Sequence, residues 1–453
     1  MKLYFLKTIF IVTSSLIVCF AKAENNSDLM DLYQAALAND PLLSSERFQN
    51  QAVKELINQG RALFLPTVSV TANYTNKNIE RKFLNQTSTN STGFFAGNNA
   101  DYDAKAYDVT IRQPLFDYSV ISTYKQMLQK TSLADKKLVL IEQDLIKDIA
   151  ALYFDTLLAR DNIDLLQTQR RAIEEQLKEA EIKFDAGLIS ITDINEAKTK
   201  KALIDAELLS AVQALKIKKR EIQSITGNLP GGLKPLSAKI SFEEMDNLPE
   251  QWIEIAHENS MAIQIKNEEV AIAEKEIDIR KGEHYPTLSA TAARRRAWEP
   301  YGGYSFGSRN YADTIGVEVE IPIFSGGLTS SRVREATLLK RKVEEESEYV
   351  KRDVELQVRK AYLTLQTNLS EISAYQIALE SSQTQLNSTK IGFQEGLRNS
   401  VEVLNAQQTF YASTRDLLSA RYNYLKNLLN LKHTVGTLSV KDIEEINKYL
   451  VME

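Results

Sequence analysis

Four long stretches without proline or glycine constrain this chain more than any other feature: 115–186, 188–226, 328–391 and 397–435. Both residues interrupt helices, so a stretch of some 65 residues without either predicts a helix about 100 Å long. Within two stretches apolar residues recur every seven positions, at Leu138, Leu145, Leu152, Ala159 and Leu166 and at Leu365, Ile372, Leu379, Leu386 and Phe393. This spacing predicts coiled-coil-like packing in a rod or tube, because no compact globule of this size holds such helices.

The sequence is also internally duplicated. Three segments of the first half recur in the second: 114–116 (PLF) as 322–324 (PIF), 183–188 (KFDAGL) as 392–397 (GFQEGL), and 225–227 (ITG) as 434–436 (TVG). Gly187 and Gly396 therefore separate two helical stretches at matched points. Each is expected to be the left-handed residue that ends one helix before the chain reverses. The duplication predicts two helical hairpins whose tips lie at the same end of the molecule.

Four other segments alternate with a period of two and predict strands: 66–74, 107–115, 285–292 and 314–323. Thr, Ser and Asn lie on one predicted face and apolar residues on the other, and about ten residues suffice to cross a bilayer at a tilt. Aromatic residues cluster near the strand ends, as at membrane interfaces: Tyr74, Tyr102, Tyr107, Phe116, Tyr118, Tyr285, Trp298, Tyr301, Tyr304 and Tyr311. A soluble four-stranded sheet is the alternative. Four strands cannot close a membrane barrel, so spanning strands would require an oligomer, and a trimer would supply twelve.

The N-terminus predicts a secretory signal peptide over 1–23, with Lys2 and Lys7, an apolar stretch 9–20 and a small-x-small cleavage site at 21–23. A retained anchor helix and lipidation at Cys19 are the alternatives. The sequence then divides into a first repeat 24–227 with a β-hairpin 66–115, a linker 228–248, a second repeat 249–436 with a β-hairpin 285–323, and a C-terminal segment 437–453. The linker and the C-terminal segment are expected to form a small equatorial region.

Composition argues against catalysis and against nucleic-acid binding. The net charge is −5 and no basic stripe with interleaved aromatics occurs, so no nucleic-acid partner is expected. The three histidines, His257, His284 and His433, are far apart in sequence, and no glycine-rich phosphate loop is present. We therefore expect no enzymatic activity, no cofactor and no metal site.

Five segments taken together resemble the TolC-like family of outer membrane factors: 29–41 (LMDLYQAALANDP), 184–193 (FDAGLISITD), 225–228 (ITGN), 322–328 (PIFSGGL), and 420–425 (ARYNYL) running on to 435–438 (VGTL). The resemblance covers nearly the whole chain after the signal peptide. It implies an α+β membrane protein and a homotrimer, in which four strands per protomer form one 12-stranded outer-membrane β-barrel, surrounded by outer membrane lipids and continuous with a long α-helical barrel in the periplasm.

The resemblance also implies a gate behind the hairpin tips. In this family an arginine after the second turn bonds to a Thr-Asp pair after the first turn, on a neighbouring helix, and these positions are Arg398, Thr192 and Asp193. Arginine suits the role because its planar donors engage a carboxylate in two bonds. A tyrosine hydroxyl of the family falls on Phe393, which cannot form that link. The alternative is that Asp193 caps a helix and Arg398 is solvated.

Two further sets of positions follow from the resemblance. The family lines its entrance with two acidic positions, which correspond to Glu402 and Asn405, so this chain would carry one carboxylate ring and weaker cation selectivity. A solvated surface Glu402 is the alternative. The family docks its adaptor at the tips, which are Gly187, Leu188, Gly396 and Leu397; the leucines could instead only staple the turns.

The predicted function is a passive exit duct for tripartite efflux, type I protein secretion or both. The expected partners are a periplasmic adaptor and an inner-membrane transporter of RND, ABC or MFS type, which open the periplasmic end. A periplasmic coiled-coil adaptor or envelope scaffold is the alternative, although the sequence shows neither a barrel-like globular domain nor an inner-membrane anchor. An envelope hydrolase would need a catalytic cluster that the sequence lacks.

Overall fold

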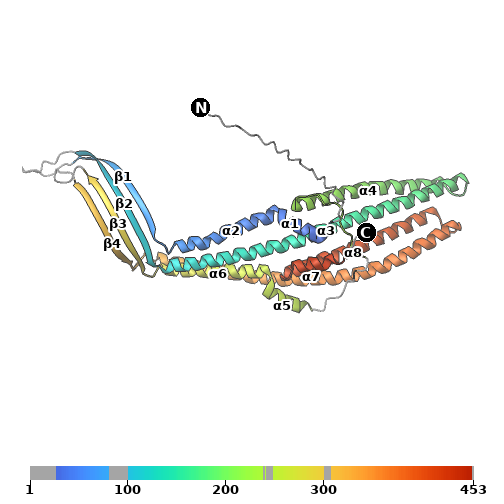
Figure 1. Ribbon diagram of the computed structural model, residues 1–453. Coiled ribbons are helices and arrows are strands. Elements are labelled where there is room, and N and C mark those ends of the chain that lie inside the picture. The colour runs from blue at the N-terminus through green and yellow to red at the C-terminus, as the bar shows by residue number, and fades with distance from the viewer. Residues whose placement is uncertain (1–26, 81–99, 238–239, 241–247, 300–307, 451–453) are drawn as a thin grey trace, which may run out of the picture.

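The protein is described by a computed structural model, which covers residues 27–80, 100–237, 240, 248–299 and 308–450. The predicted signal peptide, Cys19 and most of both loops between paired strands lie outside the described residues. The molecule is elongated, with one sheet at one end and helices along the rest of its length (Figure 1).

The long helices predicted from the sequence are confirmed. Helix α3 has 68 residues and α7 has 67, so each is about 100 Å long. The helices are α1 (Leu29–Asn39), α2 (Pro41–Ala62), α3 (Tyr118–Asp185), α4 (Ile191–Thr226), α5 (Pro249–Asn259), α6 (Met261–Gly282), α7 (Leu328–Gln394), α8 (Ser400–Val435) and α9 (Val440–Asn447). None of them, in the described part of the chain, combines the length and the apolar character that spanning a bilayer requires.

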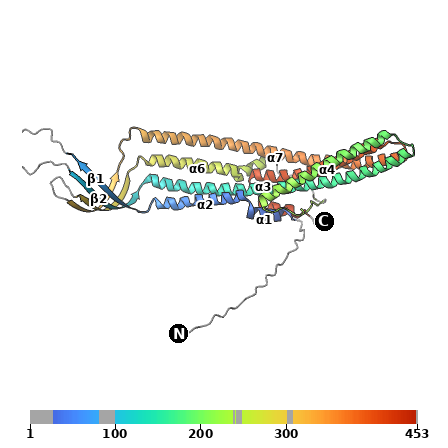
Figure 2. The same ribbon diagram turned by 90° about the horizontal axis from the view of Figure 1, so that it is seen from above.

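The element order repeats: two helices, two strands, one very long helix and one of 36 residues occur in each half. Beside the sheet α2, α3, α6 and α7 run along the molecule, and towards the far end α3, α4, α7 and α8 do so (Figures 1 and 2). Between these two bundles, α1 and α9 pack against α3 around a core that includes the fully buried side chains of Tyr153, Phe154, Leu365, Leu431 and Ile443. The Tyr153 hydroxyl donates a hydrogen bond of 2.7 Å to the carbonyl of Lys234 in the linker.

The four strands form one antiparallel sheet in the order β1 (Thr67–Ile79), β2 (Ala100–Phe116), β3 (Thr287–Glu299) and β4 (Ser308–Glu320). All four strands were predicted, but their bounds differ. All four strands extend further towards the loops than the alternation predicted, into mostly polar residues that keep the pairing. Strand β4 ends before the predicted residue 323, and Pro322 has no N–H for a ladder hydrogen bond.

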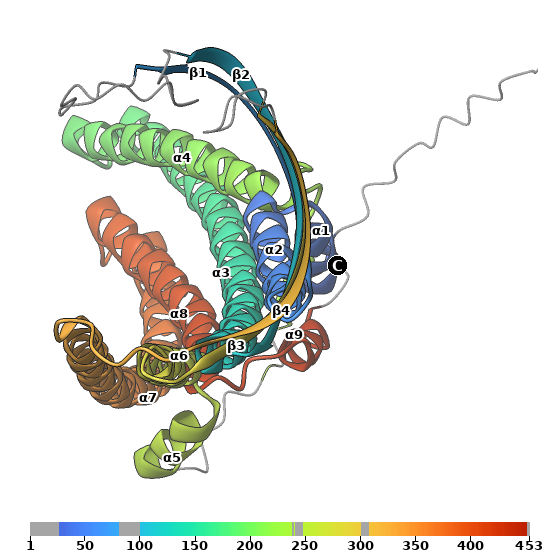
Figure 3. The same ribbon diagram turned by 90° about the vertical axis from the view of Figure 1, so that its left-hand side faces the viewer.

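The sheet has one polar and one apolar face, as the alternation predicted. The register aligns Ser69 with Thr110, and Ala293 with Thr314, on one face. The other face carries Val68, Val70, Val109, Ile111, Ile315, Val317 and Val319, all of which are exposed. Viewed from the sheet end, the strands form an open arc rather than a closed ring (Figure 3). Both edges, β1 and β4, are therefore available for pairing with another copy.

Candidate functional site

The two helical turns that the sequence predicted are confirmed, and both lie at the end of the molecule opposite the sheet (Figure 1). Gly187 has φ 72° and Gly396 has φ 73°, the left-handed conformation that glycine adopts without steric cost. After α3 the N–H of Leu188 donates to the carbonyl of Lys183 at 2.8 Å, and after α7 the N–H of Leu397 donates to that of Gly392 at 2.7 Å. The two hydrogen bonds are equivalent, so α3 and α7 end in the same type of turn.

The leucine beside each turn glycine projects into solvent. Leu188 is 72% exposed and Leu397 is 81% exposed. Neither leucine is largely covered by its own turn, and a docking role at these positions stays a prediction.

The helices that follow the turns begin with reciprocal caps. The N–H of Ser190 donates to the Asp193 carboxylate at 3.1 Å, and the N–H of Thr192 donates to the Ser190 hydroxyl at 3.2 Å. At the start of α8, the N–H of Glu402 donates to the Asn399 side chain at 2.9 Å. Asp193 and Glu402 thus occupy the third position of their capping boxes and stabilise the two helix starts.

Arg398 is mostly exposed, with 59% of its side chain accessible, and its guanidinium pairs with Glu402 of the same chain. Its guanidinium donates a charge-assisted hydrogen bond to the Glu402 carboxylate, which holds the pKa of that carboxyl below its usual range. The stem of Arg398 passes over Gly392, where an added Cβ would come within 2.8 Å of Arg398 Cγ. Within the described chain no hydrogen bond or ion pair joins Arg398 to Thr192 or Asp193, so the predicted link to a neighbouring helix stays a prediction.

Phe393 has a partner that the sequence did not predict. Its ring is buried, with only 5% of the residue exposed, and the Nζ atom of Lys183 lies 3.6 Å from the ring centroid. Further along the hairpins, the Gln176 amide donates to the Ser400 hydroxyl at 3.4 Å and Lys200 donates to the Gln408 amide oxygen at 2.9 Å. These contacts join the first hairpin to the second behind the tips. The one available sequence signal was a mismatch in the repeat, since position 183 is lysine where its counterpart, position 392, is glycine.

Glu402 and Asn405 lie one turn apart on α8, with Asn405 exposed. Gln408 and Asp416 follow on the same helix and border a groove of about 980 Å³ between the α3–α4 hairpin and α8. The groove is lined by apolar side chains such as Leu203 and by Lys200, Glu207 and Asp416. The groove is therefore amphipathic, with apolar and charged side chains along the same surface.

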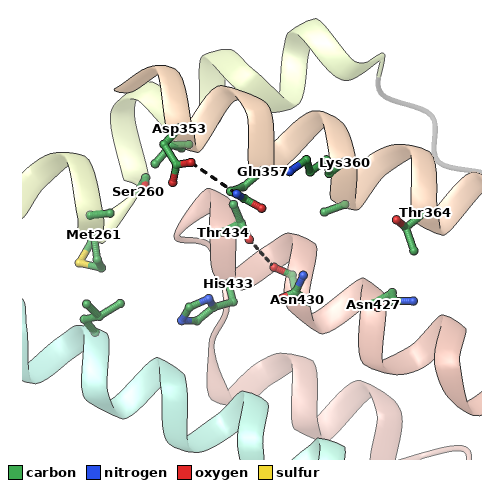
Figure 4. Close-up of a pocket in the computed structure, with 14 residues that line it drawn as sticks. Ser260, Met261, Asp353, Gln357, Lys360, Thr364, Asn427, Asn430, His433 and Thr434 are labelled. Atoms are coloured by element: carbon green, nitrogen blue, oxygen red, sulfur yellow. Dashed lines mark hydrogen bonds between the residues drawn. The ribbon is translucent and has the colours of Figure 1, made fainter. Parts of the chain in front are cut away.

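A second cavity of about 340 Å³ lies between α6, α7 and α8 (Figure 4). Its labelled lining is mainly amides and hydroxyls, and beside it the Gln357 amide donates to Asp353 at 3.4 Å and the Thr434 hydroxyl to the carbonyl of Asn430 at 2.8 Å. His433 lines this cavity and contacts Asp144 of α3 at 3.0 Å. Among the described residues, no three His, Cys, Asp or Glu side chains are grouped in a way that could hold a metal ion.

Comparison with known proteins assigns the chain at the level of family. The sequence model of the outer membrane efflux protein family matches residues 32–228 and 252–437, which is most of the chain. The chain belongs to the outer membrane efflux protein family. The predicted family, its outer-membrane location and the exit-duct function are thereby confirmed.

Individual relatives cover most of the chain. It is 27% identical to the proteases secretion protein PrtF of Dickeya chrysanthemi over 92% of this chain and 90% of the relative. It is also 27% identical to the outer membrane protein TolC of Escherichia coli K12, over 95% of this chain and 86% of that relative. Solved structures share the fold. CusC superposes with a TM-score of 0.76 and 18% identity, over 91% of this chain and 92% of that one. VceC of Vibrio cholerae superposes with a TM-score of 0.73 and 16% identity, over 90% of this chain and 96% of that one.

Proposed function

We propose that three copies of this chain assemble into one continuous conduit, with a 12-stranded barrel in the outer membrane and a helical tunnel closed at its periplasmic tips. The observation that best supports this proposal is the open, arc-shaped sheet (Figure 3). Its apolar face is exposed, and its two edge strands, β1 and β4, have no outer partner among the described residues. Ile315 is 93% exposed, which is costly in water and favourable in lipid. Pairing β4 of one copy with β1 of the next would satisfy both edges.

The tips are the proposed entrance and partner site. Leu188 and Leu397 offer exposed apolar groups to a periplasmic adaptor, and a transporter of RND, ABC or MFS type would deliver the solute. Arg398 would reach Thr192 and Asp193 of a neighbouring protomer in the closed trimer, and Glu402 would form the carboxylate ring of the constriction. Asn405 supports a single ring, because its amide carries no charge.

The relatives favour two uses of such a conduit. PrtF is named for protease secretion, and CzcC of Cupriavidus metallidurans, 24% identical over 65% of this chain, is named for cobalt-zinc-cadmium resistance. The greater coverage of the first supports protein secretion alongside small-molecule efflux. Expression in a strain that lacks its own duct tests this directly: restored secretion of a protease substrate would support the secretion role, and restored resistance alone would restrict it to efflux.

Single-channel recording in a planar bilayer tests the conduit itself. Small discrete currents are expected for the wild type, and larger ones for Arg398→Ser if Arg398 holds the tips. Lys198→Ser is the matched control, because Lys198 is an exposed cation on α4, behind the tip of the other hairpin, and lies 3.9 Å from Glu181. Unchanged currents in Arg398→Ser would overturn the gate but not the channel. A correctly assembled trimer without current would favour the scaffold alternative, which also predicts release without detergent.

A further inference from the structure

The outer half of the apolar face of the sheet carries a group of cations. Strand register places Lys105 beside Trp298 and Trp298 beside Arg309 in one row, with Arg296 and Arg294 in the next two rows. Because side chains alternate along a strand, these residues lie on the same face as Val109 and Ile315. We call Lys105, Arg294, Arg296, Arg309, Trp298 and Asp313 the basic patch.

The patch has an excess of positive charge. Asp313 receives two hydrogen bonds from Arg294, at 2.9 and 3.0 Å, and a third from Arg296 at 3.1 Å, so two guanidinium groups share one carboxylate. Arg309 lies 4.7 Å from the centroid of the Trp298 ring. The Nζ atom of Lys105 lies 5.6 Å from the centroid of the Tyr74 ring.

The other carboxylates on this face lie further out, towards β1. Asp101 and Asp103 each accept a hydrogen bond of 3.1 Å from the Asn76 amide. The cations of β3 and β4 therefore face one carboxylate, that of Asp313.

The polar face of the same strands is balanced differently. There Lys77 pairs with Glu299 at 2.6 Å, and Arg295 lies 3.7 Å from Asp108, so each of these cations has its own carboxylate. Arg295 is adjacent in sequence to both patch arginines but points to the opposite face. The surplus of positive charge is thus a property of the apolar face.

The position of the patch matches a headgroup layer. On the apolar face of β4, Ile315, Val317 and Val319 are exposed, and the row continues after the strand with the exposed side chains of Ile321 and Ile323. At ~3.3 Å per residue and a tilt of ~40°, this row spans roughly 20 Å, most of the ~25 Å apolar band of such barrels. The patch begins at the end of this row that is further from the helices. Trp298 and Tyr311, half to two-thirds exposed, lie at the same level, where interfacial aromatics are found.

We propose that the basic patch binds the phosphate-bearing headgroup of an outer-leaflet lipid. Guanidinium groups match phosphate oxygens with two parallel N–H donors, and Arg309 and Arg296 lie in adjacent rows on neighbouring strands. An anionic headgroup would balance cations that a neutral lipid leaves uncompensated at the edge of a low-dielectric layer. This inference rests on the barrel orientation proposed above, with the apolar face towards lipid.

The test uses the purified full-length trimer in a neutral detergent, with binding of diphosphoryl lipid A measured by native mass spectrometry and by thermal shift. The variant is Arg296→Gln with Arg309→Gln, and Arg295→Gln is the matched control on the opposite face. Near a membrane surface each basic side chain contributes about fivefold in affinity, so the double variant should bind roughly 25-fold more weakly while the control binds like the wild type. Fully dephosphorylated lipid A should bind the wild type as weakly as the diphosphoryl form binds the double variant.

Equal binding of diphosphoryl lipid A to the wild type and the double variant would overturn the proposal, as would equal binding of the dephosphorylated lipid. Complete competition by inorganic phosphate at the same concentration would overturn the lipid assignment in favour of a general anion site. Arg309→Gln alone, with an expected fivefold loss, provides the test if the double variant does not assemble. Single-channel current distinguishes failure of this proposal from failure of the proposed function. A trimer that conducts but does not prefer phosphorylated lipid A would overturn only the lipid-binding proposal. A trimer that does not conduct would overturn the proposed conduit.

Discussion

The ammonium group of Lys183 lies 3.6 Å from the centre of the Phe393 ring, which links the α3–α4 hairpin to the α7–α8 hairpin one turn behind the tips. Lys183 also pairs with Glu179 at 3.0 Å, which orients the side chain. Resemblance to the family placed a tyrosine hydroxyl at position 393, and its absence predicted one lost gate link. The structure shows that the aromatic ring keeps a contact between hairpins by another interaction.

Phe393→Leu should therefore loosen the tips, because it keeps an apolar side chain but removes the ring face that attracts the cation. A cation–π contact of this kind contributes about 1 kcal/mol per protomer, so the mean single-channel current should rise, by less than in Arg398→Ser. Phe393→Tyr keeps the ring and serves as the matched control, with current at or below the wild-type level. If Leu and Tyr variants conduct alike, the Lys183 contact does not hold the tips.

Glu402→Gln should remove most of the cation selectivity of the channel, because Glu402 is the single carboxylate expected at the constriction. The measurement is the reversal potential in a salt gradient. Asn405→Asp should raise selectivity by adding a second ring. Unchanged reversal potential in Glu402→Gln would show that this carboxylate does not face the pore.

The selectivity should also depend on pH in a predictable direction. Arg398 lowers the pKa of Glu402, so the carboxylate stays charged, and selectivity persists, below the usual pKa of a glutamate. Removing the guanidinium in Arg398→Ser should move the loss of selectivity to higher pH. Reversal potentials recorded between pH 6 and pH 3, as a chosen range, compare the two proteins; identical midpoints would contradict the pairing.

Gly436→Ala should destabilise the protein much more than Gly187→Ala. Both glycines have positive φ, 84° and 72°, so alanine costs roughly 1–2 kcal/mol of backbone strain at either position. A Cβ at Gly436 would in addition meet the carbonyl oxygen of Asn259 at 2.1 Å, whereas at Gly187 nothing lies within 4 Å. Thermal melting of the detergent-solubilised trimer should show a far larger drop for Gly436→Ala, and equal drops would refute the close approach of α8 to α5.

Acid should weaken the central region through Asp144. His433, 3.0 Å away, and Lys147 lower the pKa of this carboxyl to about 2, so its stabilising effect is present above pH 4 and is lost as the pH falls towards 2. Asp148, one turn on, acts in the opposite direction because burial raises its pKa. His433→Gln should lower the melting temperature at pH 7. On acidification the melting temperature of this variant should fall by less than that of the wild type.

His257→Gln is the control for that experiment, since His257 makes a similar contact with Glu355, at 3.1 Å, but both side chains are about 40% exposed. Because an exposed pair contributes at most about 1 kcal/mol, the melting temperature of His257→Gln should stay close to that of the wild type at both pH values. A parallel loss in both histidine variants would point to a general effect of removing a histidine rather than to the half-buried contact with Asp144.

Local sequence rules were sufficient for the elements themselves. Helix lengths follow from where proline and glycine occur, and the tips follow from Gly187 and Gly396, because these constraints act within a few residues of the backbone. The alternation of polar and apolar residues was sufficient to predict the two faces of the sheet. Strand ends were less predictable, since polar residues such as Asn76 and Asp103 pair across β1 and β2 only because the neighbouring strand is present.

The sequence by itself determined the long helical hairpins, the matched turns and four strands with one apolar face, because the residues responsible are close together along the chain. Only the tertiary structure decided which distant side chains meet. Lys183 reaches Phe393 through the packing of two hairpins, and Arg294 and Arg296 share Asp313 through the register of β3 with β4. Such contacts depend on three-dimensional distances that a one-residue change of register would abolish, and no spacing in the sequence reports them.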